Sequence, residues 1–237
     1  MELKIFKIAG AALFILGSGL AYAGGNKEIV QVSSIDMLSR GQYTGVYTIG
    51  ELHQYGDFGL GTFNGLNGEM VILDNRFYQV TSDGRVHAAD DAMTVPFLTT
   101  TFFHPGQKFL FKDNADEKGF KDYLKSKFRN RDHFYAIKIK GAFQFVNTRS
   151  VPKQQQPYLP LDEVVKDQQQ VFNLRNVQGT MLGFWCPAYA AGMNVPGFHF
   201  HFLTQNKKAG GHVLNFKTGN VVVEIEEIDQ FRALLSK

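Results

Sequence analysis

The most informative part of the sequence is the stretch Pro196-Gly197-Phe198-His199-Phe200-His201-Phe202, which is followed by Gly210-Gly211-His212-Val213. Strict alternation of His and Phe predicts a β-strand, because residues two apart in a strand project from the same face. We therefore expect His199 and His201 to point one way and the phenylalanine rings the other. The run 207–211 supplies turn chemistry, so an antiparallel return strand would set His212 beside the first two imidazoles.

Three neutral imidazoles that converge around an open fourth position form the arrangement that catalytic zinc uses. An amphipathic edge strand whose histidines face solvent shows the same pattern. The His-x-His pair alone decides little without its third ligand and a nearby carboxylate.

Composition narrows the class of protein. With 237 residues, 44% of them hydrophobic, the chain can bury one large core or two modest ones. Its formal charge of +3 comes from scattered residues, which gives no electrostatic footprint for nucleic acid. The single cysteine, Cys186, cannot form an internal disulfide and is predicted to be a buried structural thiol.

The N-terminus has the pattern of a secretory signal peptide over residues 1–23. Lys4 and Lys7 precede an apolar run over residues 8–20, and Ala21-Tyr22-Ala23 matches an Ala-x-Ala cleavage site. No other stretch approaches membrane-spanning length. We expect an exported protein, periplasmic or secreted, without stable membrane association after cleavage.

The remaining pattern predicts a mixed α/β (α+β) fold with extended mixed or antiparallel sheets and a few flanking helices. Period-two segments predict strands over residues 27–32, 77–81, 86–88, 97–103, 134–140, 142–148, 179–185, 198–204, 212–217 and 221–225. Helices are expected over residues 33–38, 114–128 and 161–172, and a short one carrying Ile228, Phe231 and Leu235. In the second helix, Asn114 and Glu117 resemble a capping box.

Two subdomains are expected within one catalytic unit. Residues 150–158 are rich in Pro and Gln, which suits a connection. The prediction is an N-terminal β-rich subdomain over residues 27–149 and a C-terminal subdomain over residues 150–237 that carries the histidines.

The segment 56–74 is dense in glycine, which permits tight or left-handed backbone around Thr62 and Glu69. It is not a phosphate loop, because it lacks the Gly-Lys-Ser/Thr ending and a following helical pattern. Glycine density by itself indicates only hairpins.

Several blocks, taken in order, resemble bacterial α-acetolactate decarboxylase over essentially the whole mature length. They are residues 59–64, 66–70, 134–138, 149–154, 194–202 and 210–215. The resemblance implies a zinc-dependent lyase that converts α-acetolactate to acetoin and carbon dioxide, with two mixed α/β subdomains and usually a homodimer. Matched residue by residue, it implies zinc ligands His199, His201 and His212, a site carboxylate Glu69 and a cationic residue Arg149, with Thr62 among the substrate contacts.

Decarboxylation of a β-keto acid requires the same types of residue. Loss of carbon dioxide from a β-keto acid leaves an enolate, which zinc can stabilise as a Lewis acid. Arg149 can hold the substrate carboxylate in a two-pronged fork. Glu69 can deliver a proton, complete the zinc shell, or alternate between both roles.

The expected site contains one carboxylate from the chain. Longer family members carry a C-terminal tail glutamate that reaches the metal site, and no residue here matches it. We expect water, a partner subunit or an open coordination position to take the role of the missing glutamate. We interpret the other acidic residues as surface charges: Asp113, Asp116, Glu117 and the Glu226-Glu227 pair.

Two other functions stay open on these residues. A zinc hydrolase would use metal-bound hydroxide with Glu69 as base, and its product would be a hydrolysed ester or amide. A non-catalytic exported metal- or ligand-binding protein would keep the fold without turnover.

Overall fold

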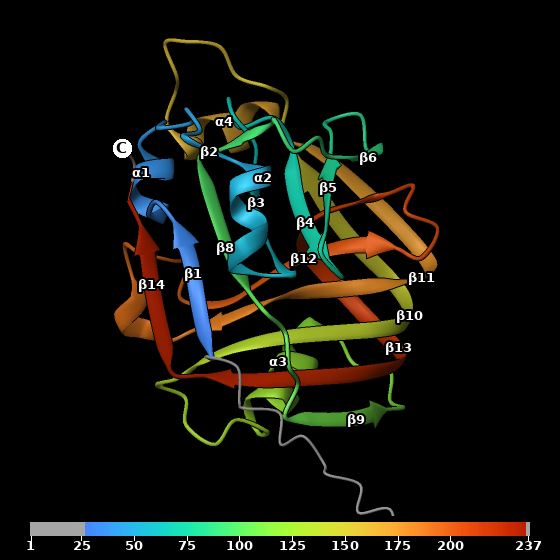
Figure 1. Ribbon diagram of the computed structural model, residues 1–237. Helices are drawn as coiled ribbons and strands as arrows, with labels where there is room; N and C mark the ends of the chain where they lie inside the picture. The colour runs from blue at the N-terminus through green and yellow to red at the C-terminus, as the bar shows by residue number, and fades with distance from the viewer. Residues whose placement is uncertain (1–26, 236–237) are drawn as a thin grey trace, which may run out of the picture.

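The computed structural model describes residues 27–235, and its strands form two main sheets that cross at a steep angle (Figure 1). The expected signal peptide, residues 1–23, lies outside the described residues. The predicted mixed architecture is confirmed.

The first sheet has seven strands in the order β14-β1-β8-β3-β4-β5-β6. All its pairings are antiparallel except that of β1 with β14. The strands are β1 (Glu28–Val32), β3 (Phe58–Thr62), β4 (Glu69–Leu73), β5 (Arg76–Val80), β6 (Val86–Ala88), β8 (Phe97–Thr101) and β14 (Gln230–Leu234). A separate two-stranded sheet pairs β2 (Tyr47–Thr48) with β7 (Thr94–Val95).

The second sheet is antiparallel and closes on itself, because β10 pairs with β11 on one edge and with β13 on the other. Its strands are β9 (Gln107–Phe111), β10 (Phe134–Ser150), β11 (Gln170–Cys186), β12 (Gly197–Thr204) and β13 (Gly210–Ile228). Segments predicted as separate strands on either side of Gly141, and around residues 218–220, are therefore continuous β10 and β13.

Period-two alternation divides the side chains of the second sheet between two cores. One face, with Ile137, Met181 and Phe202, packs with α3 (Glu117–Lys125). The other face, with Leu182 and Leu203, packs against the first sheet. Apolar contacts therefore join the two sheets across this second core.

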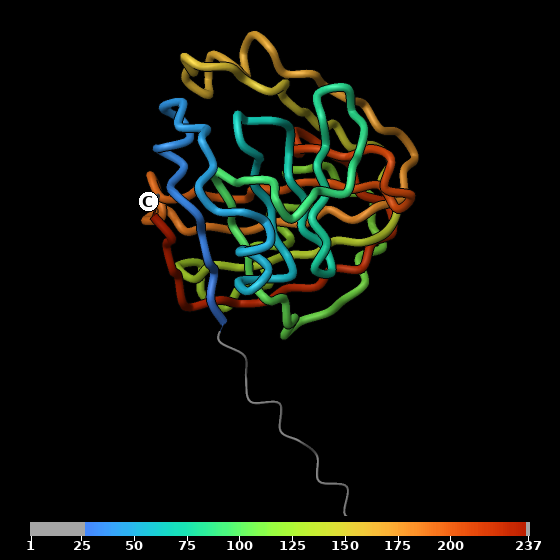
Figure 2. Tube along the Cα trace, turned by 45° about the horizontal axis from the view of Figure 1, so that its top comes forward, coloured from blue at the N-terminus to red at the C-terminus, as the bar shows by residue number. Residues whose placement is uncertain are grey.

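Three further short helices lie at the ends of strands: α1 (Ile35–Ser39), α2 (Ile49–Leu52) and α4 (Leu161–Gln168), with 3-10 turns His53–Tyr55 and Ala188–Ala190. The connection from β10 to β11, which contains α4, extends over one end of the first sheet (Figure 2). There Val164 of α4 shares a small core with Leu38 of α1.

The expectation of a C-terminal helix is wrong. Phe231 belongs to β14, which pairs in parallel with β1, and its ring stacks on Phe134 at 5.4 Å. A strand partner from the other end of the chain outweighs the helix-like spacing of three apolar residues.

Other helix boundaries also differ from expectation. The helix predicted to reach residue 172 ends at Gln168, because Gln169 is extended and Gln170 begins β11. The cap of α3 is Asp116, whose Oδ1 accepts the Gly119 N–H at 2.8 Å, and not Asn114. Helix α2 was not predicted, although Thr48 and Glu51 form a capping box.

Each of the two sheets contains strands from both sides of residue 150. Strands β9 and β10 precede it and lie in the second sheet, whereas β14 follows it and lies in the first. The chain therefore crosses between the sheets more than once.

Glu226 is not a surface charge. Its side chain is 2% exposed, and its Oε2 accepts the His104 N–H at 2.8 Å. Cys186 is buried as predicted, and burial raises the pKa of its thiol to about 12.

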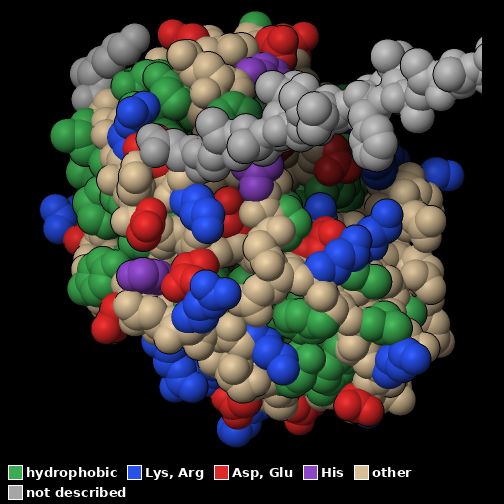
Figure 3. Space-filling view, turned by 60° about the horizontal axis from the view of Figure 1, so that its bottom comes forward, with side chains coloured by type: hydrophobic (Ala, Val, Ile, Leu, Met, Phe, Trp, Pro, Cys, Tyr) green, Lys and Arg blue, Asp and Glu red, His purple; other side chains and the backbone are tan. Residues whose placement is uncertain are grey.

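The surface agrees with the scattered charge seen in the sequence. On the face shown in Figure 3, Lys and Arg side chains alternate with Asp and Glu. Among residues 27–235, no helix has the length and apolar character needed to cross a membrane.

Candidate active site

The β12–β13 hairpin brings three histidines together as the alternation predicts. His201 pairs with His212 across the strands, and His199 lies two residues away on the same face. The ring centroids are 4.9 to 5.3 Å apart. One ligand atom from each residue lies within 4.8 Å of the others. Phe200 and Phe202 point into the opposite core.

A backbone contact fixes the state of His201. Its Nδ1–H donates to the Met70 carbonyl at 2.7 Å, so Nε2 keeps a lone pair. This contact also ties the second sheet to β4 of the first. A ring held in this way presents a defined nitrogen to a metal ion.

The three imidazoles are held neutral. Burial first, and then the nearby Arg149 guanidinium, lower the pKa of His199 to about 4. The pKa values of His201 and His212 also lie well below the ordinary value, chiefly because of burial.

This donor set fits a metal ion. His199 Nε2 lies 3.2 Å from His212 Nδ1. The buried His199 Nδ1 has no hydrogen-bond partner within the described part of the chain. Neutral imidazole nitrogens are the ligands of three-histidine zinc sites, so the residues present suit a metal of that kind.

Glu69 enters the site from the start of β4. Its Oε2 lies 3.5 Å from His201 Nε2, and its Oε1 lies 3.5 Å from Arg149 Nη1. Burial raises the pKa of Glu69 to about 7, and the positive charge of Arg149 opposes that rise only in part. At neutral pH the carboxyl can therefore exist in either protonation state.

The turn before Glu69 depends on glycine. Gly68 has φ +80°, and a Cβ there would lie 2.3 Å from the Val80 carbonyl oxygen. The Thr62 hydroxyl donates to the Gly68 carbonyl at 2.7 Å. Thr62 thus holds the turn that places Glu69, and its hydroxyl keeps only acceptor capacity toward the pocket.

Arg149 lies near the end of β10, opposite His212 in the strand pairing. Its side chain is 14% exposed and faces the same pocket. The pairing of β10 with β13, which closes the second sheet, therefore places the Arg149 guanidinium beside the histidines.

All six residues predicted for the site line one pocket of about 120 Å³: Thr62, Glu69, Arg149, His199, His201 and His212. The other four histidines do not line it. His53 pairs with Asn75 and Asp91, and His133 with Glu227.

The sequence reasoning missed the apolar wall of the pocket. It consists of residues from β8, α1, α4 and loops: Ile35, Leu38, Leu66, Phe97, Val151, Leu161 and Val195. Leu66, Val151 and Val195 fall within the blocks that resemble the decarboxylase, and that was the signal available. The rest are ordinary core residues in the sequence.

The fold and this pocket define a mixed α/β enzyme with three histidines, a carboxylate and a guanidinium in one enclosed site. The chain belongs to the alpha-acetolactate decarboxylase family, whose model matches residues 29–237. The family consists of carboxy-lyases.

Relatives and solved structures agree with this membership. The alpha-acetolactate decarboxylase of Brevibacillus brevis is 43% identical over 203 residues, which cover 86% of this chain and 71% of the relative. That of Methanosarcina mazei is 43% identical over 84% of this chain and 70% of its own length. The crystal structure of alpha-acetolactate decarboxylase from Bacillus subtilis strain 168 matches with a TM-score of 0.87 and 38% identity, covering 89% of each chain.

Proposed function

We propose that this protein decarboxylates α-acetolactate to acetoin and carbon dioxide, with a zinc ion held by His199, His201 and His212. The observation that carries the proposal is the convergence of these histidines with Glu69 and Arg149 in one pocket of a decarboxylase-family fold. When bound, the metal would supply Lewis-acid stabilisation of the negative charge that carbon dioxide loss leaves on the former ketone oxygen.

Arg149 has the position and shape to bind the substrate carboxylate. Its guanidinium is largely buried beside the histidines, so a carboxylate paired with it would be oriented and shielded from water. Orientation matters because the breaking carbon–carbon bond must align with the neighbouring carbonyl.

Glu69 is suited to move the proton that replaces carbon dioxide. Its pKa of about 7 lets the carboxyl give up a proton and regain one near neutral pH. The 3.5 Å contacts with Arg149 and His201 hold it between the carboxylate-binding and metal-binding ends of the pocket.

The apolar wall would take the methyl groups of the substrate. Leu38, Leu66 and Phe97 are buried and present no hydrogen-bonding group to a ligand. A dry wall strengthens the charge interactions on the opposite side of the pocket.

The test is an acetoin assay on the purified mature protein with racemic α-acetolactate, before and after chelation and after zinc is restored. Zinc-dependent acetoin formation is the expected result. Stoichiometric zinc without acetoin would contradict the proposal.

We also propose export after cleavage behind Ala23, and a homodimer. The support is the leader pattern in residues 1–23 and the resemblance to dimeric decarboxylases. Mass spectrometry of the mature N-terminus and light scattering of the purified protein test the two points separately.

A further inference from the structure

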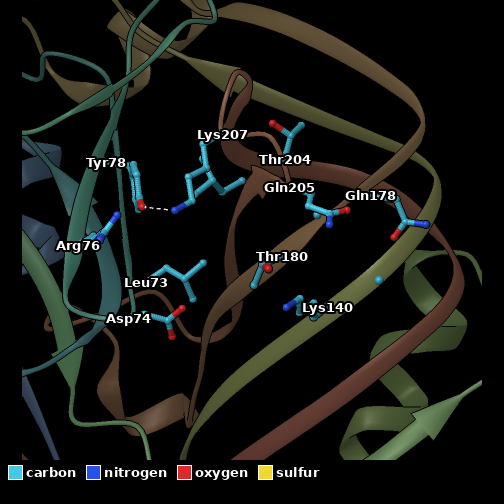
Figure 4. A pocket seen from close by; sticks show the side chains of 13 residues that line it. Leu73, Asp74, Arg76, Tyr78, Lys140, Gln178, Thr180, Thr204, Gln205 and Lys207 are labelled. Atoms are coloured by element: carbon cyan, nitrogen blue, oxygen red, sulfur yellow. Dashed lines mark hydrogen bonds between the residues drawn. The ribbon is translucent and has the colours of Figure 1, made fainter.

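A second and larger pocket, of about 520 Å³, lies between the two sheets away from the histidines (Figure 4). The β4–β5 hairpin forms one side of it, and β10, β11 and the β12–β13 turn form the other. Lys140, Thr180 and Leu203 are cross-strand neighbours on its floor. The pocket is therefore built from paired strands.

The charges around this pocket are unbalanced. Arg76, Lys140 and Lys207 line it with a single acid, Asp74. Among residues 27–235, Arg76 and Lys140 form no ion pair, whereas Lys138, two residues from Lys140 on the same strand face, pairs with Glu224 at 2.9 Å. The pocket thus gathers a net positive charge from three separate chain segments.

Lys207 comes from one side of the pocket and contacts Tyr78 on the other side. Lys207 Nζ donates to the Tyr78 hydroxyl at 2.6 Å and lies 4.9 Å from the centre of its ring (Figure 4). Tyr78 is buried, whereas Lys207 stands in the exposed β12–β13 turn. The contact holds an ammonium group across the mouth of the pocket, where two of its hydrogens remain free to donate.

Neutral donors complete the lining. Thr180, Gln178 and Gln205 add hydroxyl and amide groups beside the cations. Arg76 offers a planar fork that matches carboxylate and phosphate oxygens, and the two lysines act as point charges. From these groups we propose that this pocket binds a small organic dianion through its carboxylate or phosphate oxygens.

The proposed anion site is separate from the active site. Strand β12 contributes His201 to the active site and Leu203 to this pocket. Val71 and Leu182 are fully buried in the core between the two sheets. Arg149 does not line the second pocket, so the two sites do not share a cation.

The test is a titration of the zinc-loaded, isotope-labelled protein with succinate and, separately, with inorganic phosphate, at constant ionic strength adjusted with potassium chloride. Amide signals of residues 74–78 and 204–207 should shift and saturate with at least one probe. Saturation by phosphate alone identifies a phosphate-bearing ligand, and saturation by succinate alone identifies a dicarboxylate.

Variants assign the binding to this pocket. Arg76→Gln with Lys207→Gln should raise the Kd of the effective probe at least about tenfold, since two charged hydrogen-bond donors are lost. The matched control is Arg85→Gln with Lys208→Gln, because these nearby cations are exposed and line no part of the pocket. Acetoin formation should be the same in both double variants, which shows that each is folded.

Three results would overturn the proposal. One is the absence of saturation with both probes. Another is an equal loss of affinity in the control variant, which would mean that the probe responds to the net charge of the protein and not to this pocket. The third is a set of shifts confined to the neighbourhood of Glu69 and Arg149.

Discussion

His201 shows how a single side chain links the sheets to the chemistry. Its Nδ1–H is committed to the Met70 carbonyl, and Met70 directly follows Glu69 in β4. The strand that carries the site carboxylate therefore also orients a histidine of the proposed metal site. A small displacement of β4 would move both groups together.

Replacement of Glu69 by Gln separates metal binding from proton transfer. Glu69→Gln keeps the size of the side chain but cannot ionise, so zinc content should be retained while the rate of acetoin formation falls about 10²-fold or more. Metal analysis and an acetoin assay measure the two effects. Glu224→Gln, a variant outside the pocket, is the control. Near-full activity in Glu69→Gln would remove Glu69 from the proton-transfer role.

Arg149→Lys tests the two-pronged contact with the substrate. Lysine keeps the charge but loses the planar donor pair, so kcat/KM should fall roughly tenfold or more. Steady-state kinetics give the value, and Arg175→Lys, an exposed position on β11, should behave like the wild type. Unchanged kinetics in Arg149→Lys would show that Arg149 does not bind the substrate carboxylate.

Glu226 predicts a dependence of stability on pH. Burial raises the pKa of its carboxyl, and the hydrogen bond from His104 offsets this only in part. Because the folded pKa lies above the unfolded value, the contribution of this group to stability is full below the unfolded pKa and is lost as pH rises through the folded pKa. Glu226→Gln removes that loss and keeps an acceptor for the His104 N–H.

The stability of Glu226→Gln relative to wild type should therefore be higher at about pH 8 than at about pH 4. Urea denaturation at the two pH values measures it. Asp229→Asn, at an exposed position, is the comparison. A difference between Glu226→Gln and wild type that is the same at both pH values would contradict the prediction.

At the scale of elements, local pattern predicted the β12–β13 hairpin well and the chain ends poorly. The alternation of His and Phe, with the turn that follows, was enough to predict the strand, its two faces and the approach of His212. All of this information lies within one short segment. The spacing of Ile228, Phe231 and Leu235 fits a helix equally well. The strand state of β14 depends on β1, a partner that no local window includes.

The residues of the site also fall into those that the sequence could predict and those that it could not. The histidines, Glu69 and Arg149 could be named from their residue types and from the resemblance to a known family. The apolar wall could not, since Leu38, Phe97 and Leu161 meet only through packing of α1, β8 and α4. The burial of Glu226 was missed for a related reason, because its partner is the backbone of His104 on a distant loop.

The turn between β3 and β4 gives a prediction at this scale. Gly68→Ala places a Cβ against the Val80 carbonyl at a positive φ, so it should destabilise the fold by about 1–3 kcal/mol and displace Glu69. Chemical denaturation and acetoin formation should both report the loss. Gly106→Ala is the matched control, because nothing lies within 4 Å of the added carbon. Equal behaviour of the two variants would show that the turn does not depend on glycine.

At the scale of the molecule, the proposed metal would join β12 and β13, which already pair at His201 and His212. A zinc Kd one hundredfold below the free zinc concentration should add about 2.7 kcal/mol to the free energy of unfolding. Chelation should therefore lower Tm and abolish acetoin formation, and added zinc should restore both. Calorimetry with metal analysis checks this, and an unchanged Tm after verified zinc loss would contradict it.

The pairing of β1 with β14 also has a consequence for how the protein reaches its folded state. The first strand and the last described strand are neighbours, so β1 has one open edge until almost the entire chain has been arranged. Contacts between such distant segments form slowly, because the entropy of closing a long loop is lost before the contacts stabilise the fold. An open strand edge is a template for pairing with another chain. During refolding, intermediates that lack β14 would therefore be the species most prone to self-association, and dilution should favour their productive completion.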